Sequence, residues 1–223
     1  MARVRTRFPK VFVGHPFGNR FATKKFRKLF QELPFKVIYG NTDVRTEHLL
    51  NIMKRDIQKS DFAIFDLSGW NPNVSMELGL AEGLKEKAGK PYYILLNTRR
   101  SREVPADVRG IQRLEYTRYD YKPQVGLGSQ LIEYILRKEY WVRKIYKEIS
   151  GTGKTDKKLE LCLKIIAHLR DNQKLTPENF QDLTRGSRLR EQDRQKVLGI
   201  LKGFRFIRKL RNSSVYMRYR TAF

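Results

Sequence analysis

The sequence predicts an α/β protein in which helices cover both faces of a parallel sheet, followed by a small helical domain. Through the first 150 residues, short apolar runs alternate with segments of helical periodicity. The apolar runs are continuous, as expected for strands of a parallel sheet that is buried on both faces. Beyond residue 150 the strand pattern gives way to helices. We therefore predict two domains, residues 1–150 and residues 151–223.

Five strands are predicted from apolar runs that end at glycine, proline or polar residues. They cover residues 10–17, 35–40, 61–68, 91–97 and 113–119. The helices are expected to end near Leu33, to begin at Thr46, to begin at Pro72 and to cover 127–149. Ligands of parallel sheets bind beyond the carboxyl ends of the strands. The candidate loops are therefore GHPFGN (14–19), YGNTD (39–43) and DLSGWNPN (66–73).

The helix after the third loop carries a glutamate on its apolar face. Asn71 is a favourable N-cap and Pro72 suits the first helical turn. A carboxylate held against apolar surface is costly unless it is paired, and its proton affinity is raised. Glu77 is therefore either a structural group that bonds to a loop or an arginine, or a reactive carboxylate that assists glycosidic cleavage. At about 100° per residue, it projects from an arc of apolar side chains: Val74, Leu78, Leu80, Ala81 and Leu84.

A resemblance to known enzymes lies in four segments: VFVGHPF, IQKSDFAIFDLSGWNPNVSMELGLAEGL, KPYYILLN and VPADVRGIQRLEY, within residues 8–136. Together they resemble bacterial TIR-like domains and the related nucleoside 2-deoxyribosyltransferase-like fold. The resemblance implies a flavodoxin-like fold that cleaves N-glycosidic bonds, of NAD in the first group and of nucleosides or nucleotides in the second. It also implies NAD as a substrate, homo-oligomeric assembly in the active state, and a role as an antiphage defence effector.

The same resemblance implies roles for particular residues. Glu77 matches the catalytic glutamate of both groups, and Asp56 resembles an acidic residue that handles the nucleobase proton in the transferases. The transferases usually carry aspartate six residues before the glutamate, where this chain has Asn71. An amide cannot act as that acid, so the resemblance favours NAD cleavage over base exchange. The implied substrate-binding residues lie in the three loops: Gly14, His15, Pro16, Phe17, Asp43, Asp66, Asn71 and Asn73.

The last 73 residues predict three helices and a hairpin, which is the pattern of a winged-helix domain. A first helix follows from the apolar spacing between Leu159 and Leu169. Thr176 and Pro177 open a short second helix, and a third is expected over 189–202. The segment FRFIRKLRNSSVYMRYR then alternates on both sides of a turn at 212–214, as in a β-hairpin.

The charge balance points to a polyanionic partner. The chain carries 47 basic and 23 acidic residues, a net charge of +24, and residues 151–223 hold 18 of the basic and 7 of the acidic ones. Such a surface attracts nucleic acid, so DNA is the expected partner; the alternative is a domain that dimerises or docks to another protein. The expected nucleic-acid contacts are Arg188, Arg190, Arg194, Lys196, Arg208, Lys209, Arg211 and Arg218.

Other features narrow the function classes. No apolar run approaches the ~20 residues that span a bilayer and no signal peptide opens the chain, so we expect a cytoplasmic protein without a membrane partner. Cys162 is the single cysteine, and His48 and His168 stand alone, so neither a metal nor a cofactor is expected. GTGKT (151–155) lacks the first glycine and the preceding strand of a phosphate-binding loop, so we interpret it as a linker.

Two function classes fit these features. The first is an NAD glycohydrolase with a nucleic-acid-binding domain. The second is a DNA-bound regulator whose α/β domain holds a nucleotide without turnover. A nucleoside 2-deoxyribosyltransferase or nucleotide N-glycosidase is a further alternative within the enzyme class. Turnover that depends on Glu77 distinguishes the enzymes from the regulator.

Overall fold

The chain divides into two compact units. The computed structural model describes residues 8–16, 20–40, 49–89, 91–101, 111–151, 153–185, 187–210 and 213–218. The first unit, here called the α/β unit, comprises Pro9–Phe30 and Phe35–Gln130. The second, the C-terminal unit, joins Phe8 and Gln31–Pro34 to the chain from Leu131 onward. The chain therefore leaves the α/β unit for the last time after residue 130, whereas the expected domain boundary lies at 150.

A parallel sheet forms the centre of the α/β unit. Its strand order is β2-β1-β3-β4-β5, and each neighbouring pair runs parallel. All carboxyl ends therefore lie at one edge, and the order reverses between β1 and β3, where ligands of such sheets bind. The five predicted strands are confirmed, each shorter than its expected range: β1 Lys10–Gly14, β2 Lys36–Tyr39, β3 Phe62–Asp66, β4 Tyr92–Asn97 and β5 Arg113–Tyr116.

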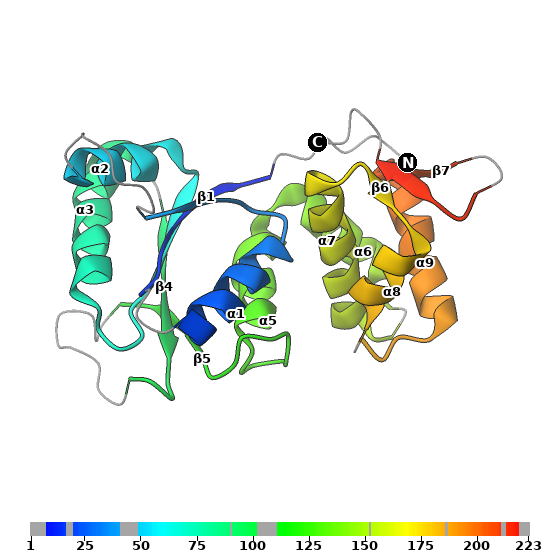
Figure 1. The fold of residues 1–223 in the computed structure, drawn as a ribbon, viewed down its shortest axis with the longest axis horizontal. Coiled ribbons are helices and arrows are strands. Elements are labelled where there is room, and N and C mark those ends of the chain that lie inside the picture. The colour runs from blue at the N-terminus through cyan, green and yellow to red at the C-terminus, as the bar shows by residue number, and fades with distance from the viewer. Residues whose placement is uncertain are drawn as a thin grey trace. The chain divides into compact units, whose positions relative to one another are not determined.

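Helices cover both faces of this sheet, as predicted. On one face lie α2 (Leu49–Lys59) and α3 (Pro72–Ala88), which pack against each other. On the other lie α1 (Arg20–Gln31) and the short α5 (Leu127–Gln130) (Figure 1). The expected start of the second helix at Thr46 lies outside the described residues.

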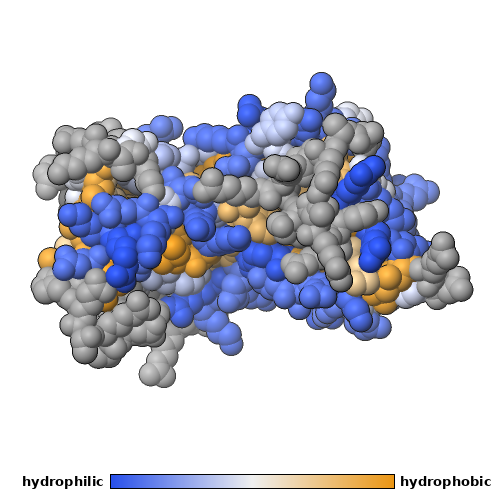
Figure 2. All heavy atoms as spheres, turned by 90° about the horizontal axis from the view of Figure 1, so that it is seen from above, coloured by the Kyte–Doolittle hydropathy of each residue, from blue (hydrophilic) through white to orange (hydrophobic). Residues whose placement is uncertain are grey.

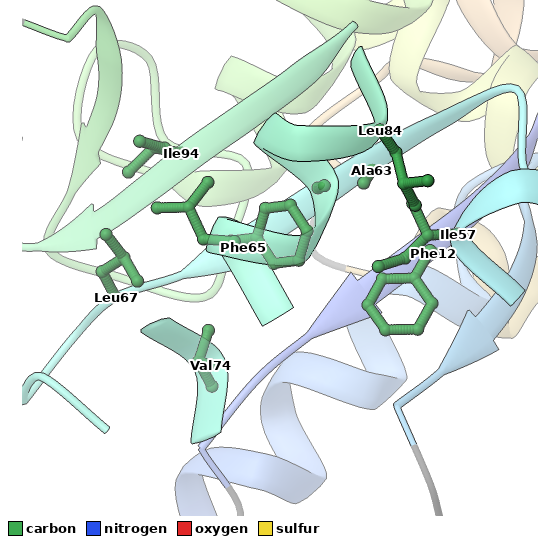
Figure 3. Packing of buried hydrophobic residues seen from close by; sticks show 10 residues of the cluster. Phe12, Ile57, Ala63, Phe65, Leu67, Val74, Leu84 and Ile94 are labelled. Carbon is green, nitrogen blue, oxygen red and sulfur yellow. The ribbon is translucent and has the colours of Figure 1, made fainter. Parts of the chain in front are cut away.

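The core beneath α2 and α3 is apolar and continuous. Strand side chains such as Phe12 and Phe65 meet Ile57 of α2 and the inner face of α3 (Figure 3). These strand residues alternate with Val11, Val13 and Ile64, which are also fully buried, so the strands are apolar on both faces of the sheet. The cluster fixes the position of α3 on the sheet, and its members are Phe12, Ile57, Ala63, Phe65, Leu67, Val74, Leu78, Ala81, Leu84 and Ile94.

The long helix expected over 127–149 is wrong. The segment contains α5, a π-helical turn η1 (Leu131–Ile135), a 3₁₀ turn η2 (Leu136–Lys138) and α6 (Tyr140–Ile149). Glu139, between η2 and α6, has an extended backbone. The buried residues explain the break: Leu136 precedes Trp141 by five positions, which on one continuous helix would place these two side chains about 140° apart. Both side chains are buried because the helix is interrupted.

The C-terminal unit is built from helices and a small antiparallel sheet. The predicted helices are confirmed as α7 (Thr155–Asp171), α8 (Pro177–Thr184) and α9 (Glu191–Gly203). The hairpin is confirmed as β7 (Ile207–Lys209) and β8 (Tyr216–Arg218), paired antiparallel. A further strand, β6 (Lys174–Leu175), was not predicted, and it pairs with β8 to give the order β6-β8-β7. Helix α6 packs against α7 and therefore belongs to this unit.

Hydrophilic side chains predominate on the face of the molecule shown in Figure 2, with apolar residues visible between them. Within the described part of the chain, no helix has the length and apolar character needed to cross a membrane.

Candidate active site at the carboxyl edge of the sheet

Helix α3 begins at the carboxyl edge of the sheet and carries the predicted glutamate. The Asn71 side-chain oxygen accepts hydrogen bonds from the backbone N–H groups of Asn73 at 3.0 Å and Val74 at 3.4 Å. Asn71 is therefore the N-cap, as predicted. Val74, Leu78, Ala81 and Leu84 are buried whereas Ser75, Gly79 and Glu82 are exposed. The predicted apolar face with Glu77 in it is confirmed.

Two glycines enclose the Glu77 carboxyl group. Its Oε2 lies against Gly14, the last residue of β1, and its Oε1 lies against Gly40, the residue after β2. A Cβ atom on Gly40 would stand 2.5 Å from Oε1, and one on Gly14 would overlap Oε2. The carboxyl group therefore occupies space that any other residue at these two strand ends would fill.

The environment of Glu77 favours its neutral form. Only 7% of the residue is exposed, and no described residue donates a hydrogen bond to the buried Oε2. Desolvation by burial raises the pKa of Glu77 from 4.5 to about 7. A carboxyl group with that pKa can accept or release a proton at neutral pH. The donor to Oε2 that a purely structural role requires is not among the described residues.

Asp66, at the end of β3, is buried and saturated with hydrogen bonds. Its Oδ2 accepts from Tyr116 Oη at 2.9 Å and lies 2.9 Å from His15 Nδ1. Its Oδ1 accepts from the Ser68 backbone N–H at 3.1 Å and from the Ser68 hydroxyl. Ser68 Oγ in turn accepts from the Asn97 backbone N–H at 2.7 Å. One carboxylate thus ties together the carboxyl ends of β1, β3, β4 and β5.

His15 is positioned by Asp66 and by a ring contact. Its imidazole stacks on Phe26 of α1 with ring centroids 3.9 Å apart and planes within 7°. Only 2% of His15 is exposed. Because Gly14 precedes it and contacts Glu77, the bond between His15 and Asp66 also fixes the backbone beside the glutamate. The structure therefore brings Gly14, His15 and Asp66 together, with His15 and Asp66 engaged by each other.

The remaining predicted site residues are spread along the edge. Pro16 is buried after β1, and Asn73 is exposed in the first turn of α3. Asp56 is half-buried on α2, and no hydrogen bond or ion pair joins its side chain to Glu77 among the described residues. Phe17 and Asp43 lie outside the described residues.

Three residues of this edge were not among the predicted site residues, although Gly40 and Ser68 lie in two of the candidate loops. Gly40 mirrors Gly14 at the end of the neighbouring strand, so its position in FKVIYG was a signal that could have been used. Ser68 and Tyr116 complete the bonding of Asp66. Ser68 is two residues from Asp66, so its bonds to that carboxylate are local, whereas Tyr116 is 50 residues away and only the sheet register brings it to Asp66.

The predicted nucleic-acid residues lie in two places in the C-terminal unit. Lys196 is exposed and Arg194 half-buried on α9, whereas Arg188 and Arg190 are exposed before its first turn, because the helix expected from residue 189 begins at Glu191. Leu189, between the two arginines, is buried. Arg208 and Lys209 are exposed on β7. Arg211 and the side chain of Arg218 lie outside the described residues.

No protein-family model and no curated protein sequence matches this chain. The candidate site therefore stands on the chemistry of its own residues.

Proposed function

We propose that this protein is an enzyme that cleaves an N-glycosidic bond, with NAD as the first candidate substrate and Glu77 as the catalytic residue. In this proposal the α/β unit is a TIR-like domain of flavodoxin-like fold, and the C-terminal unit is a winged-helix domain that binds nucleic acid. The observation that carries the proposal is the Glu77 carboxyl group, buried at the carboxyl edge between Gly14 and Gly40 with its pKa raised to about 7.

The reaction uses that carboxyl group in its ionised form. The bond between C1′ of the ribose and the nicotinamide nitrogen breaks, and its electron pair leaves with nicotinamide. Positive charge develops on the ribose ring, and the Glu77 carboxylate stabilises it. Water attacks C1′ and gives one proton to Glu77, which acts as general base. The products are nicotinamide, ADP-ribose and the proton, which Glu77 then releases to solvent.

The strand order also supports a nucleotide substrate. In doubly wound sheets of order 2-1-3-4-5, ligands bind where the order reverses, beyond the carboxyl ends of β1 and β3. Gly14 and Asp66 end these two strands, and Glu77 lies against Gly14. A ribose placed beside Glu77 would thus occupy the usual ligand position of such a sheet.

A second candidate function is a DNA-bound regulator whose α/β unit holds a nucleotide without turnover. The burial of His15 and Asp66 and the bond between them favour it, because two side chains engaged with each other hold the edge rigid but do not act on a bound nucleotide. A nucleoside 2-deoxyribosyltransferase or nucleotide N-glycosidase would use the same glutamate. Asn71 does not favour the transferase, because an amide cannot act as the acid and its side chain is engaged as the N-cap of α3.

Product analysis tests the proposal. The protein is incubated with NAD, NADP, nucleosides and nucleotides in turn, with and without DNA, and the small molecules are separated by chromatography. We expect free nicotinamide from NAD, and at least about a hundredfold less from Glu77→Gln, which removes the charge but keeps the shape.

Glu82→Gln is the matched control. Glu82 lies on the exposed side of the same helix, and its hydrogen bond with Tyr92 can be kept by an amide oxygen. Full activity of this variant beside an inactive Glu77→Gln would locate the effect at Glu77. Binding of a nucleotide with no product from any substrate would favour the regulator, and activity in both variants would overturn the role of Glu77.

Assembly is part of the proposal, because activity in TIR-like enzymes depends on it. Specific activity should rise with protein concentration, and the active species should elute from a sizing column ahead of the monomer. Activity that is independent of concentration in a monomer would contradict this point.

A further inference from the structure

The exposed face of α6 combines a tyrosine with three cations. Tyr140, Arg143 and Lys147 are exposed and Lys144 is half-buried. These residues are spaced three and four apart, so they form one row along the helix. The opposite face of α6 is buried in the C-terminal unit through Trp141, Val142, Ile145 and Ile149. The row faces solvent because the helix packs its other side.

The tyrosines of this segment are interleaved with cations. The Lys144 ammonium lies 4.7 Å from the centroid of the Tyr140 ring, and the Arg137 guanidinium lies 4.0 Å from that of Tyr146. Tyr140 nevertheless remains 59% exposed. The row contains three cations, and the one exposed acid of α6, Glu148, lies beside the row rather than in it. Cations beside an exposed aromatic ring are the combination that holds unpaired nucleic-acid bases.

Helix α6 is also a neighbour of the basic hairpin. The ring of Trp141 contacts that of Phe206, with centroids 6.1 Å apart. Phe206 directly precedes β7, and Arg205, Arg208 and Lys209 around it are exposed. Two basic segments that are about sixty positions apart in the sequence therefore lie on adjacent elements of one unit. The nucleic-acid contacts expected on α9 and on the hairpin do not include any residue of α6.

We infer that the face of α6 formed by Tyr140, Arg143, Lys144 and Lys147 is a further contact for nucleic acid, specifically for a single-stranded segment. The three cations bind successive phosphates, and Tyr140 stacks on an unpaired base. Lys144 covers one side of the Tyr140 ring, which leaves the other for the base. The inference rests on the proposed binding of nucleic acid by the C-terminal unit, and it extends that binding from duplex to single strands.

The test measures binding of the full chain to fluorescent oligothymidylate and to a blunt duplex by anisotropy, over a range of salt concentrations. Tyr140→Ala should weaken binding to the single strand between about 5-fold and about 150-fold, with a much smaller effect on the duplex. Tyr140→Phe keeps the ring and should bind within about twofold of the unchanged protein. All variants are first compared by thermal melting, since Tyr140 is exposed and its replacement should leave folding intact.

A charge-matched pair of triple variants separates the α6 face from the general basicity of the chain. Arg143→Gln, Lys144→Gln and Lys147→Gln together should lower the salt slope for the single strand by about 2. Lys24→Gln, Lys54→Gln and Lys59→Gln remove the same charge from exposed positions of the α/β unit and should leave the slope nearly unchanged.

The outcomes distinguish this inference from the proposed function. If the unchanged protein binds both probes but the α6 variants match the α/β controls, the α6 contact is overturned and nucleic-acid binding stands. If the unchanged protein binds neither probe at low salt, both the α6 contact and the proposed binding of nucleic acid by the C-terminal unit are contradicted. An equal loss for Tyr140→Ala and Tyr140→Phe would also overturn the stacking role.

Discussion

The Glu77 carboxyl group is held where its ionisation costs free energy. Burial raises its pKa to about 7 from an ordinary value of 4.5, so the folded chain holds a proton that the unfolded chain has lost between these two pH values. Stability from this group is complete below pH 4.5 and is lost as the pH rises through about 7. A structural residue has no need of such a cost, which is why the position points to chemistry.

Replacement of Glu77 by glutamine should stabilise the fold in a pH-dependent way. Glutamine mimics the neutral acid, so the variant avoids the cost of ionisation, which is roughly 3 kcal/mol for this rise in pKa. Urea unfolding at pH 8 should show Glu77→Gln more stable by up to that amount, and at pH 4.5 by far less. Glu82→Gln, an exposed change on the same helix, should show no such trend. An equal effect of Glu77→Gln at both pH values would contradict the raised pKa.

Gly40 should be a site where activity is lost without loss of the fold. A Cβ at this position would stand 2.5 Å from Glu77 Oε1 and 3.3 Å from the Phe12 ring. The carboxyl group is the end of a flexible side chain, so it moves aside, and a displacement of about 1 Å can lower turnover about a hundredfold. Gly40→Ala should therefore retain most of its free energy of unfolding and lose turnover. Gly14→Ala is the contrasting variant, because its Cβ also meets the buried Phe65 ring at 2.8 Å and should destabilise the fold. Full turnover by Gly40→Ala would contradict the argument that Gly40 positions the Glu77 carboxyl group.

At the scale of elements, helix α3 begins at a favourable N-cap but has glycines of low helix propensity in its middle. Asn71 caps its first turn, and the buried residues of the inner face are apolar apart from Glu77. Gly79 and Gly83 interrupt the outer face, and an added Cβ at either would meet no atom within 4 Å. The helix is therefore held to the sheet by packing rather than by intrinsic propensity.

Gly79→Ala should stabilise the protein. The residue is exposed and helical, so alanine gains helix propensity of about 0.5–1 kcal/mol without steric cost. Chemical denaturation gives the change in the free energy of unfolding. Gly69→Ala is the comparison, because Gly69 has φ of 76° and alanine there is strained despite equal space. The idea fails if both changes have the same sign.

At the scale of the whole molecule, we expect the net charge of +24 to dominate the proposed interaction with nucleic acid. Affinity for duplex DNA should fall steeply with salt, with a slope of log K against log salt of about −0.9 for each phosphate neutralised. Arg208→Gln with Lys209→Gln should make that slope shallower by about 2. Lys54→Gln with Lys59→Gln removes equal charge from α2 and should change it little. Binding that does not respond to salt would contradict phosphate contacts by the hairpin.

Most of the secondary structure could be predicted, because it depends on local periodicity. All five strands of the parallel sheet, the N-cap Asn71 and the helix starting at Pro177 follow from patterns of a few residues. The failures come where packing overrides that pattern. The sequence pattern of segment 127–149 predicts one continuous helix. The helix is nevertheless interrupted, because Leu136 and Trp141 are both buried. Strand β6 has two residues and exists because β8 lies beside it.

The sequence by itself determined that Glu77 faces the core of an α/β fold, because helical spacing fixes which side chains share a face. Tertiary structure alone decided what that carboxyl group meets. Gly14 and Gly40 reach it through the register of β1 and β2, and Asp66 bonds to His15 and Tyr116 from 51 and 50 residues away. Such contacts depend on which strands pair and in what register, and pairing is a property of the whole sheet rather than of any one segment.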